Sequence, residues 1–224
     1  MTGQMVTFSS NGGTAEGYLA TPKSGSGPGI IVLQEYWGLV PHIKDVADRF
    51  AAEGFVALAP DLYQGKTTTH PDEALRLMMA MNIGETEKEL RGATALLKTK
   101  SSTQKIGSIG FCLGGSLALF AATLNPDFGA CIDLYGANPA IKPDFSKLNC
   151  PVLGLFGVTD SYIPQTSIDA LAANIRAAGR TCEIHVYPGA GHAFFNDARP
   201  EAYNAAAAAD AWTRTLAFLR ANLR

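Results

Sequence analysis

Charged side chains are scarce in this sequence of 224 residues: Asp, Glu, Lys and Arg make up 17% of it, and the formal net charge is −2. The few Lys and Arg residues form no basic stripe, which a protein needs in order to neutralise the phosphates of nucleic acid. Nucleic acid is therefore not an expected partner.

Long apolar runs are missing as well. A helix needs about 20 consecutive apolar residues to cross a bilayer, and no stretch of the sequence reaches that length. The first residues, Met1 to Ser10, carry neither the basic nor the apolar segment of a signal peptide. We expect no membrane partner and a cytoplasmic location.

Cysteine is rare, and its spacing fits neither a disulfide framework nor a metal site. None of the four Cys residues stands in a C-x-x-C pair or at a Cys/His ligand spacing. A chain of this size can bury enough apolar surface to fold without disulfides or metals. We expect reduced thiols at Cys112, Cys131, Cys150 and Cys182, and the sequence predicts no metal ion and no organic cofactor.

What the chain does contain is a regular alternation of strand and helix patterns. Continuous apolar runs such as Gly29–Leu33 are typical of parallel strands covered on both faces. Further strand patterns lie at residues 55–59, 106–109, 129–135, 151–156 and 182–187, and a hairpin around Asn11 joins residues 6–8 to 17–20. Helical spacing appears at residues 42–53, 73–81, 85–97, 167–178 and 200–223. This order predicts one α/β domain, residues 1–224, with a mostly parallel sheet and helices on both faces.

The most informative stretch is Gly110-Phe111-Cys112-Leu113-Gly114-Gly115, between a strand pattern and an apolar helix pattern. G-x-nucleophile-x-G at such a junction is the nucleophile elbow of α/β-hydrolases, here with Cys where Ser is usual. The N-terminus of the following helix favours a thiolate. The alternative is a buried structural Cys beside an ordinary turn.

An acid and a base follow the elbow in the expected order. Asp160 and His192 each lie in a loop that leaves a predicted strand, and α/β-hydrolases place nucleophile, acid and His in this sequence. The imidazole takes the thiol proton, and the carboxylate holds the imidazole in the right tautomer. Alone, Asp160 is better explained as a turn-capping residue and His192 as a polar loop residue. Their agreement in type, order and position with Cys112 favours a catalytic triad.

Other candidates fit less well. Asp133 is the second choice for the acid, but its neighbours place it inside a strand. His185 lies in the middle of a strand, His42 opens a helix and His70 lies in a polar loop. We interpret the remaining cysteines, Cys131, Cys150 and Cys182, as packing residues.

The chain resembles the dienelactone hydrolase (carboxymethylenebutenolidase) family over nearly its whole length. The residues that carry the resemblance are Gln34-Glu35, the Cys112 elbow, Asp160 and the stretch from Gly191 to Phe194. The resemblance implies an α/β-hydrolase fold and hydrolysis of a lactone or ester through a Cys acyl-enzyme. It also implies that the Glu35 carboxylate contacts the resting thiol until substrate binds; a solvent-facing loop carboxylate is the alternative. By the same resemblance, the backbone N–H groups of Tyr36 and Leu113 form the oxyanion hole.

The departures from the family concern the substrate. The family holds a substrate carboxylate with two arginines, whereas this chain has Asn196 in place of the second and Ala193 where a hydroxyl residue is usual. Arg76 and Arg199 are the nearest substitutes, and each is equally well explained as a solvated helix-end residue. Because an anion needs a positioned cation, we expect a more apolar ester or lactone. Its pocket would be lined by Tyr36, Trp37, Tyr63, Phe194 and the methionines at 78–81, although helix core is the simpler explanation of the methionines.

The leading hypothesis is a Cys-dependent hydrolase of a small-molecule lactone or ester, acting as a monomer or weak homodimer. A non-catalytic ligand-binding or thiol redox-sensor protein on the same fold is the alternative, although a sensor would not need a complete triad. A third possibility is a hydrolase of a thioester or small amide.

Overall fold

The computed structural model describes residues 3–10 and 12–224, which form eight strands, six α-helices and one short 3-10 helix. The strands are β1 (Gln4–Ser10), β2 (Gly13–Ala20), β3 (Gly29–Leu33), β4 (Val56–Pro60), β5 (Ile106–Phe111), β6 (Phe128–Leu134), β7 (Val152–Gly157) and β8 (Cys182–Tyr187). The helices are α1 (Pro41–Ala52), α2 (Pro71–Met79), α3 (Ile83–Lys100), α4 (Leu113–Leu124), η1 (Phe145–Lys147), α5 (Gln165–Ala177) and α6 (Ala205–Asn222).

All eight strands belong to one sheet, in the order β1-β2-β4-β3-β5-β6-β7-β8. β1 and β2 pair antiparallel, as do β2 and β4, and every pair from β4/β3 to β7/β8 is parallel. The carboxyl ends of the parallel strands therefore meet at one edge of the sheet. In open α/β sheets this edge is where functional loops gather.

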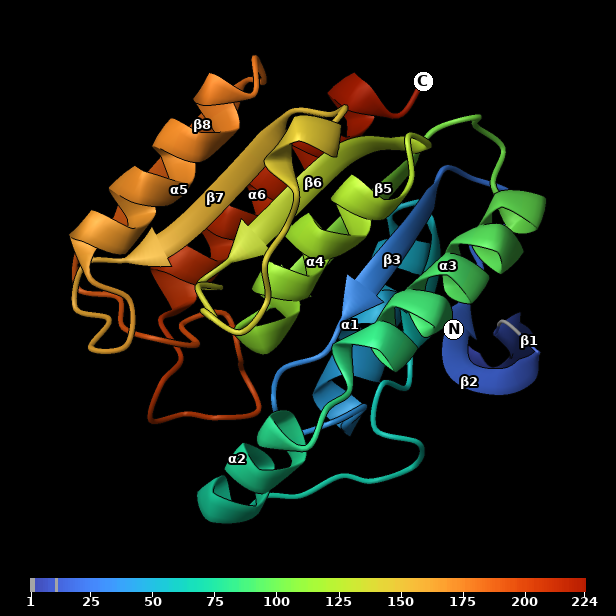
Figure 1. Ribbon diagram of the computed structural model, residues 1–224, viewed down its shortest axis with the longest axis horizontal. Coiled ribbons are helices and arrows are strands. Elements are labelled where there is room, and N and C mark those ends of the chain that lie inside the picture. The colour runs from blue at the N-terminus through green and yellow to red at the C-terminus, as the bar shows by residue number, and fades with distance from the viewer. Residues whose placement is uncertain (1–2, 11) are drawn as a thin grey trace.

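Helices cover both faces of the sheet. Figure 1 shows α3, α4 and α5 in front of it, with α1 and α6 behind. On the α1/α6 face, Phe50 and Leu219 pack in one cluster with Ile132 of β6. On the other face, Leu97 and Leu117 pack in a second cluster with Leu33 of β3. The strands between these two layers are apolar on both sides, which explains their unbroken apolar runs.

The α/β class and the mostly parallel sheet predicted from the sequence are confirmed. Helix ends differ from the periodicity where a side chain caps the backbone. Asn82 accepts hydrogen bonds from two N–H groups and starts α3 at Ile83, and Asn204 accepts from Ala207 and starts the last helix at Ala205 rather than at residue 200. The β1–β2 hairpin is present, but Asn11 at its turn lies outside the described residues, as do Met1 and Thr2 of the segment that lacks signal-peptide features.

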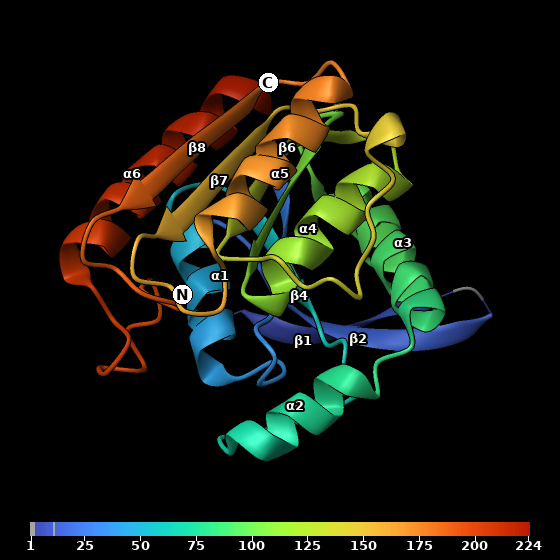
Figure 2. The same ribbon diagram turned by 60° about the vertical axis from the view of Figure 1, so that its left-hand side comes forward.

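Helix α2 stands apart from the layered body. Figures 1 and 2 show it beyond the edge where the parallel strands end. Ala74 is its one fully buried residue, whereas Leu75 is 45% and Met79 77% exposed. No helix of the described residues is long and apolar enough to cross a membrane.

Candidate active site

Cys112 occupies a strained backbone position between β5 and α4. Its φ of 55° and ψ of −118° lie outside the regions that L-residues usually adopt. Its N–H donates to Leu134 O at 3.0 Å, and its carbonyl accepts from Gly115 N at 3.0 Å, so both sides of the turn are held. A Cβ at Gly114 would collide with the carbonyl oxygen of Leu33. Glycine is therefore required where the elbow passes the end of β3, and the half-buried Cys112 side chain lines a cavity.

Asp160 and His192 meet above the same edge of the sheet. His192 Nδ1 lies 2.7 Å from Asp160 Oδ2. The other carboxyl oxygen, Oδ1, accepts from the N–H groups of Tyr162 at 2.8 Å and Ile163 at 3.2 Å, which orients the carboxylate toward the imidazole. Thr159 N donates to Ala190 O at 3.0 Å and ties the β7 loop to the β8 loop.

The charge state of His192 follows from these neighbours. Burial disfavours the imidazolium, but the Asp160 hydrogen bond, followed by Cys112, outweighs it and raises the pKa of His192 to about 10. A protonated His192 beside Cys112 stabilises a thiolate.

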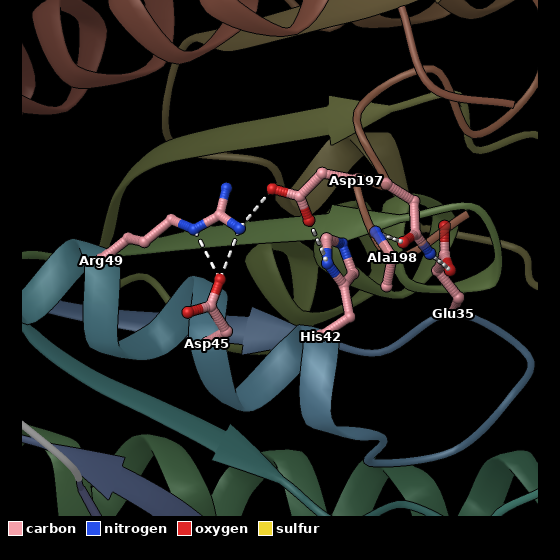
Figure 3. Close-up of polar contacts among 7 residues, drawn as sticks. Glu35, His42, Asp45, Arg49, Asp197 and Ala198 are labelled. Atoms are coloured by element: carbon pink, nitrogen blue, oxygen red, sulfur yellow. Dashed lines mark hydrogen bonds and ion pairs between the residues drawn. The ribbon is translucent and has the colours of Figure 1, made fainter. Parts of the chain in front are cut away.

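Glu35 is buried, 1% exposed, just after β3 ends, and it lines the same cavity as Cys112 and His192. Glu35, which is labelled in Figure 3, accepts a hydrogen bond of 2.7 Å at Oε2 from the side-chain amide of Asn196, while its Oε1 has no hydrogen-bond partner among the described residues. Burial raises the pKa of Glu35, opposed by the Asn196 hydrogen bond and by the charges of His192 and Arg199. The hydrogen bond of the carboxyl thus goes to Asn196, and contact with the Cys112 thiol stays a prediction.

Two residues that line the cavity with Cys112, Tyr36 and Leu113, have unpaired backbone N–H groups among the described residues. Leu113 is the first residue of α4, so its N–H has no acceptor within the helix. Tyr36 N–H likewise donates no hydrogen bond to another described residue. Free backbone donors near a nucleophile can bind the oxyanion of a tetrahedral intermediate. Their role as an oxyanion hole stays a prediction.

A cavity of about 730 Å³ opens above Cys112 and His192. Trp37 and Arg199 line it, and the Arg199 guanidinium stacks on Trp37 at 4.6 Å from the ring centre while pairing with Glu201 at 2.7 Å. Of the other residues expected in the pocket, Tyr63 and Phe194 are buried outside the lining and Arg76 is exposed on α2. The apolar side chains of α2 that do line it are Pro71, Leu75, Met78 and Met79.

Tyr135, Tyr162 and Asn196 are site residues that the sequence did not single out for these positions. Tyr135 follows β6 with a positive φ of 43°, and its ring centre lies 5.2 Å from that of His192. The Tyr162 ring centre lies 5.1 Å from that of His192. The rule that strand carboxyl ends converge could have found Tyr135. No local pattern marks Asn196 as the partner of a carboxylate far away in the chain.

The competing candidates lie elsewhere. Asp133 is fully buried within β6, and burial raises its pKa well above the usual range. His42 is buried on α1, and burial lowers its pKa. The other three cysteines are buried away from the cavity lining. Among the described residues no cluster of three or more His, Cys, Asp or Glu side chains is arranged to hold a metal ion.

The sheet order, the elbow after β5 and the carboxylate and imidazole after β7 and β8 define an α/β-hydrolase fold. Comparison with known proteins narrows the class: residues 15–223 match the model of the dienelactone hydrolase family, and the chain belongs to that family.

Relatives of the chain extend over its whole length. It is 37% identical to "Protein usf" of Aquifex pyrophilus over 97% of this chain and 98% of that protein. It is 32% identical to the "Putative carboxymethylenebutenolidase" of Aquifex aeolicus, covering 99% of this chain and 100% of that one. The crystal structure of the "Putative Dienelactone Hydrolase" from Klebsiella pneumoniae superposes with a TM-score of 0.87 at 32% identity, covering 98% of this chain and 99% of that chain.

Proposed function

We propose that this protein hydrolyses a lactone or carboxylic ester through an acyl-enzyme on Cys112. The observation that supports the proposal is a strained Cys and a hydrogen-bonded His–Asp pair whose imidazole lines the same cavity. The carboxymethylenebutenolidase name of the relatives belongs to the same reaction type, cleavage of a carboxylic ester bond.

The first half of the cycle forms a thioester. The Cys112 thiolate attacks the carbonyl carbon, and the oxygen of the tetrahedral intermediate accepts hydrogen bonds from the N–H groups of Tyr36 and Leu113. Collapse breaks the bond to the leaving oxygen, which takes the proton held by His192. Removal of one such donor costs roughly 3–4 kcal/mol in related acyl-transfer chemistry.

The second half regenerates the thiol. Neutral His192 takes a proton from water, which attacks the thioester carbonyl, and the bond from carbon to sulfur breaks to release the acid. Asp160 keeps the imidazole in the tautomer that presents Nε2 to the reacting atoms and stabilises it when protonated.

The cavity favours an uncharged substrate with apolar groups. Arg199 is the cation of the lining beside His192, and its charge is already shared between Glu201 and the face of Trp37. Next to Glu35 the chain places the neutral amide of Asn196. The remaining wall is largely aliphatic or aromatic, which suits apolar acyl or alcohol groups. The cytoplasmic location and the monomer or weak homodimer stay predictions.

Activity profiling over aryl esters and lactones tests the proposal, with wild type, Cys112→Ala and Cys182→Ala compared. Cys182 is 9% exposed, the most accessible of the other cysteines that the structure describes, and serves as the matched control. We expect Cys112→Ala to lose turnover at least 10³-fold, one equivalent of iodoacetamide on Cys112 to abolish it, and Cys182→Ala to retain it. Esterase activity that survives Cys112→Ala would overturn the proposal.

A further inference from the structure

Exposed apolar side chains gather around the cavity above Cys112. Six large hydrophobic side chains are exposed among the described residues, and three of them, Leu75, Met79 and Tyr162, line this cavity. Single exposed apolar residues are ordinary on a protein surface, but a group of them around one cavity indicates a surface that binds a ligand. Leu75 and Met79 belong to α2, whereas Tyr162 comes from the loop between β7 and α5.

The backbone of Tyr162 is held in place although its side chain is 78% exposed. Its N–H donates to Asp160 Oδ1 at 2.8 Å, and the N–H of Ile163 donates to the same oxygen at 3.2 Å. Ile163 is only 5% exposed, and Pro164 follows it as the N-cap of α5. A tyrosine side chain has two rotatable bonds, so placing its ring against a ligand costs little conformational entropy. The loop therefore presents an aromatic surface from a fixed backbone position.

The Tyr162 ring lies against the imidazole of His192. The two ring centres are 5.1 Å apart and the planes are tilted by 65°, which is an edge-to-face contact. Tyr135 makes a similar contact with His192 at 5.2 Å, but it is fully buried. Burial raises the pKa of the Tyr36 hydroxyl, Cys112 raises it further and Tyr162 adds a smaller rise, so Tyr162 lies near the same part of the cavity. Of the two rings that contact the imidazole, Tyr162 is the one that a ligand can reach.

We propose that Tyr162 is a specificity-determining residue for the leaving group: its exposed ring binds the alcohol part of the ester and favours an aromatic alcohol. The inference rests on the proposed function, in which His192 gives its proton to the leaving oxygen. An oxygen within hydrogen-bond reach of the imidazole brings the group attached to it beside the ring that contacts this imidazole. A pair of aromatic rings gains attraction beyond the burial of apolar area, and a saturated alcohol does not.

Two esters with the same acyl group test the inference, a phenyl ester and a hexafluoroisopropyl ester. Both alcohols are good leaving groups, but only phenol is aromatic. The acyl group is the one that the activity panel hydrolyses fastest. We expect Tyr162→Ala to lower kcat/KM about three- to tenfold for the phenyl ester and less than about twofold for the other. This constant covers acylation, the step in which the leaving group departs.

Tyr162→Phe keeps the ring, and Val158→Ala is the matched control. Val158 is 60% exposed at the start of the same loop but does not line the cavity. Both variants should stay within about twofold of wild type for both esters. Binding of phenol and cyclohexanol to Cys112→Ala, with and without Tyr162→Ala, gives a readout without turnover. Loss of the ring should weaken phenol binding about three- to tenfold and cyclohexanol binding less than about twofold.

Equal losses for the two esters in Tyr162→Ala would make Tyr162 a positioning residue for His192 and overturn the inference, as would an unchanged kcat/KM for the phenyl ester. A loss in Tyr162→Phe as large as that in Tyr162→Ala would assign the effect to the hydroxyl group and overturn it too. Failure of the proposed function appears separately, as ester hydrolysis that persists in Cys112→Ala, and phenol binding tests the ring in either case.

Discussion

Cys112 holds a backbone conformation that costs free energy, and its neighbours make that conformation possible. Gly110 lets β5 approach α4, and Gly114 lets α4 approach the end of β3, so closely that a side chain at either position would meet backbone atoms. The positive φ of Cys112 is held by hydrogen bonds on both sides of the turn. At this scale the chemistry depends on glycines as much as on the thiol.

Gly114→Ala is expected to destabilise the protein by more than about 2 kcal/mol, because the new methyl group collides with the Leu33 carbonyl and the core cannot relax around a backbone atom. Gly84→Ala is the matched control: it also lies at the second position of a helix, and its Cβ would meet only Asn82 Oδ1, at 3.3 Å. Its change should stay within about 1 kcal/mol. Urea unfolding of both variants measures the difference, and equal values would contradict the steric explanation.

The raised pKa of His192 makes stability depend on pH. In the unfolded chain the imidazole loses its proton near 6.5, but in the folded protein it keeps the proton to about 10. The stabilising contribution is therefore complete below pH 6.5 and is lost as pH rises toward 10. Wild type should therefore have a higher free energy of unfolding than His192→Gln at pH 6.5, and this difference should shrink as pH rises to 10.

Asp160→Asn provides the control for the His192 titration. Without the carboxylate, the pKa of His192 falls toward its ordinary value. The difference in free energy of unfolding between Asp160→Asn and the double variant Asp160→Asn/His192→Gln should then be nearly independent of pH above 7. Denaturant titrations at several pH values give both comparisons. A constant gap between wild type and His192→Gln from pH 6.5 to 10 would contradict the assignment of a protonated His192.

Helix α2 is the element that the layered fold needs least. It contributes one fully buried residue, yet its exposed apolar side chains Leu75 and Met79 line the cavity above Cys112. Apolar groups left outside the core in this way indicate a surface that contacts substrate rather than one that stabilises the fold. Helix α3, which follows directly, is the opposite case, because Leu97 on it is fully buried.

Leu75→Ala should therefore affect substrate binding and not stability. We expect KM for esters with long acyl chains to rise about three- to tenfold, since each apolar carbon returned to water costs about 0.8 kcal/mol, with the free energy of unfolding changed by less than about 0.5 kcal/mol. Leu97→Ala should lower stability by about 2–5 kcal/mol and leave KM nearly unchanged. Kinetics and urea unfolding of both variants measure the effects on substrate binding and on stability. A Leu75→Ala protein with wild-type KM for every ester would rule out a role of α2 in substrate binding.

At the scale of the whole molecule, one sheet joins both core clusters. Each central strand contributes side chains to the α1/α6 face and to the face under α3, α4 and α5, so neither face can lose its packing alone. The two tryptophans report on different places: Trp212 packs against Phe50 at 4.5 Å between ring centres, and Trp37 lines the cavity. These sites lie in different parts of the proposed single domain.

We expect both reporters to follow one unfolding transition. With Trp37→Phe and Trp212→Phe each leaving one tryptophan, the fluorescence midpoints in urea should agree with each other and with the far-UV circular dichroism of the same variant. A Trp37 signal that is lost at lower urea than the circular dichroism would show that the cavity region unfolds separately, and would argue against one cooperative unit.

The sequence alone was sufficient for the α/β class, the elbow and the order of Cys112, Asp160 and His192, because each of these depends on local features: apolar periodicity, glycines beside a nucleophile, and loops directly after strands. Helix ends were less accurate, since caps such as Asn204 act through single hydrogen bonds that periodicity does not register. Tertiary structure alone determined the partner of Glu35, the place of Tyr135 beside His192 and which arginine reaches the cavity. These contacts join residues far apart in the chain, and their direction depends on how the loops pack at the sheet edge, which no short stretch of sequence encodes.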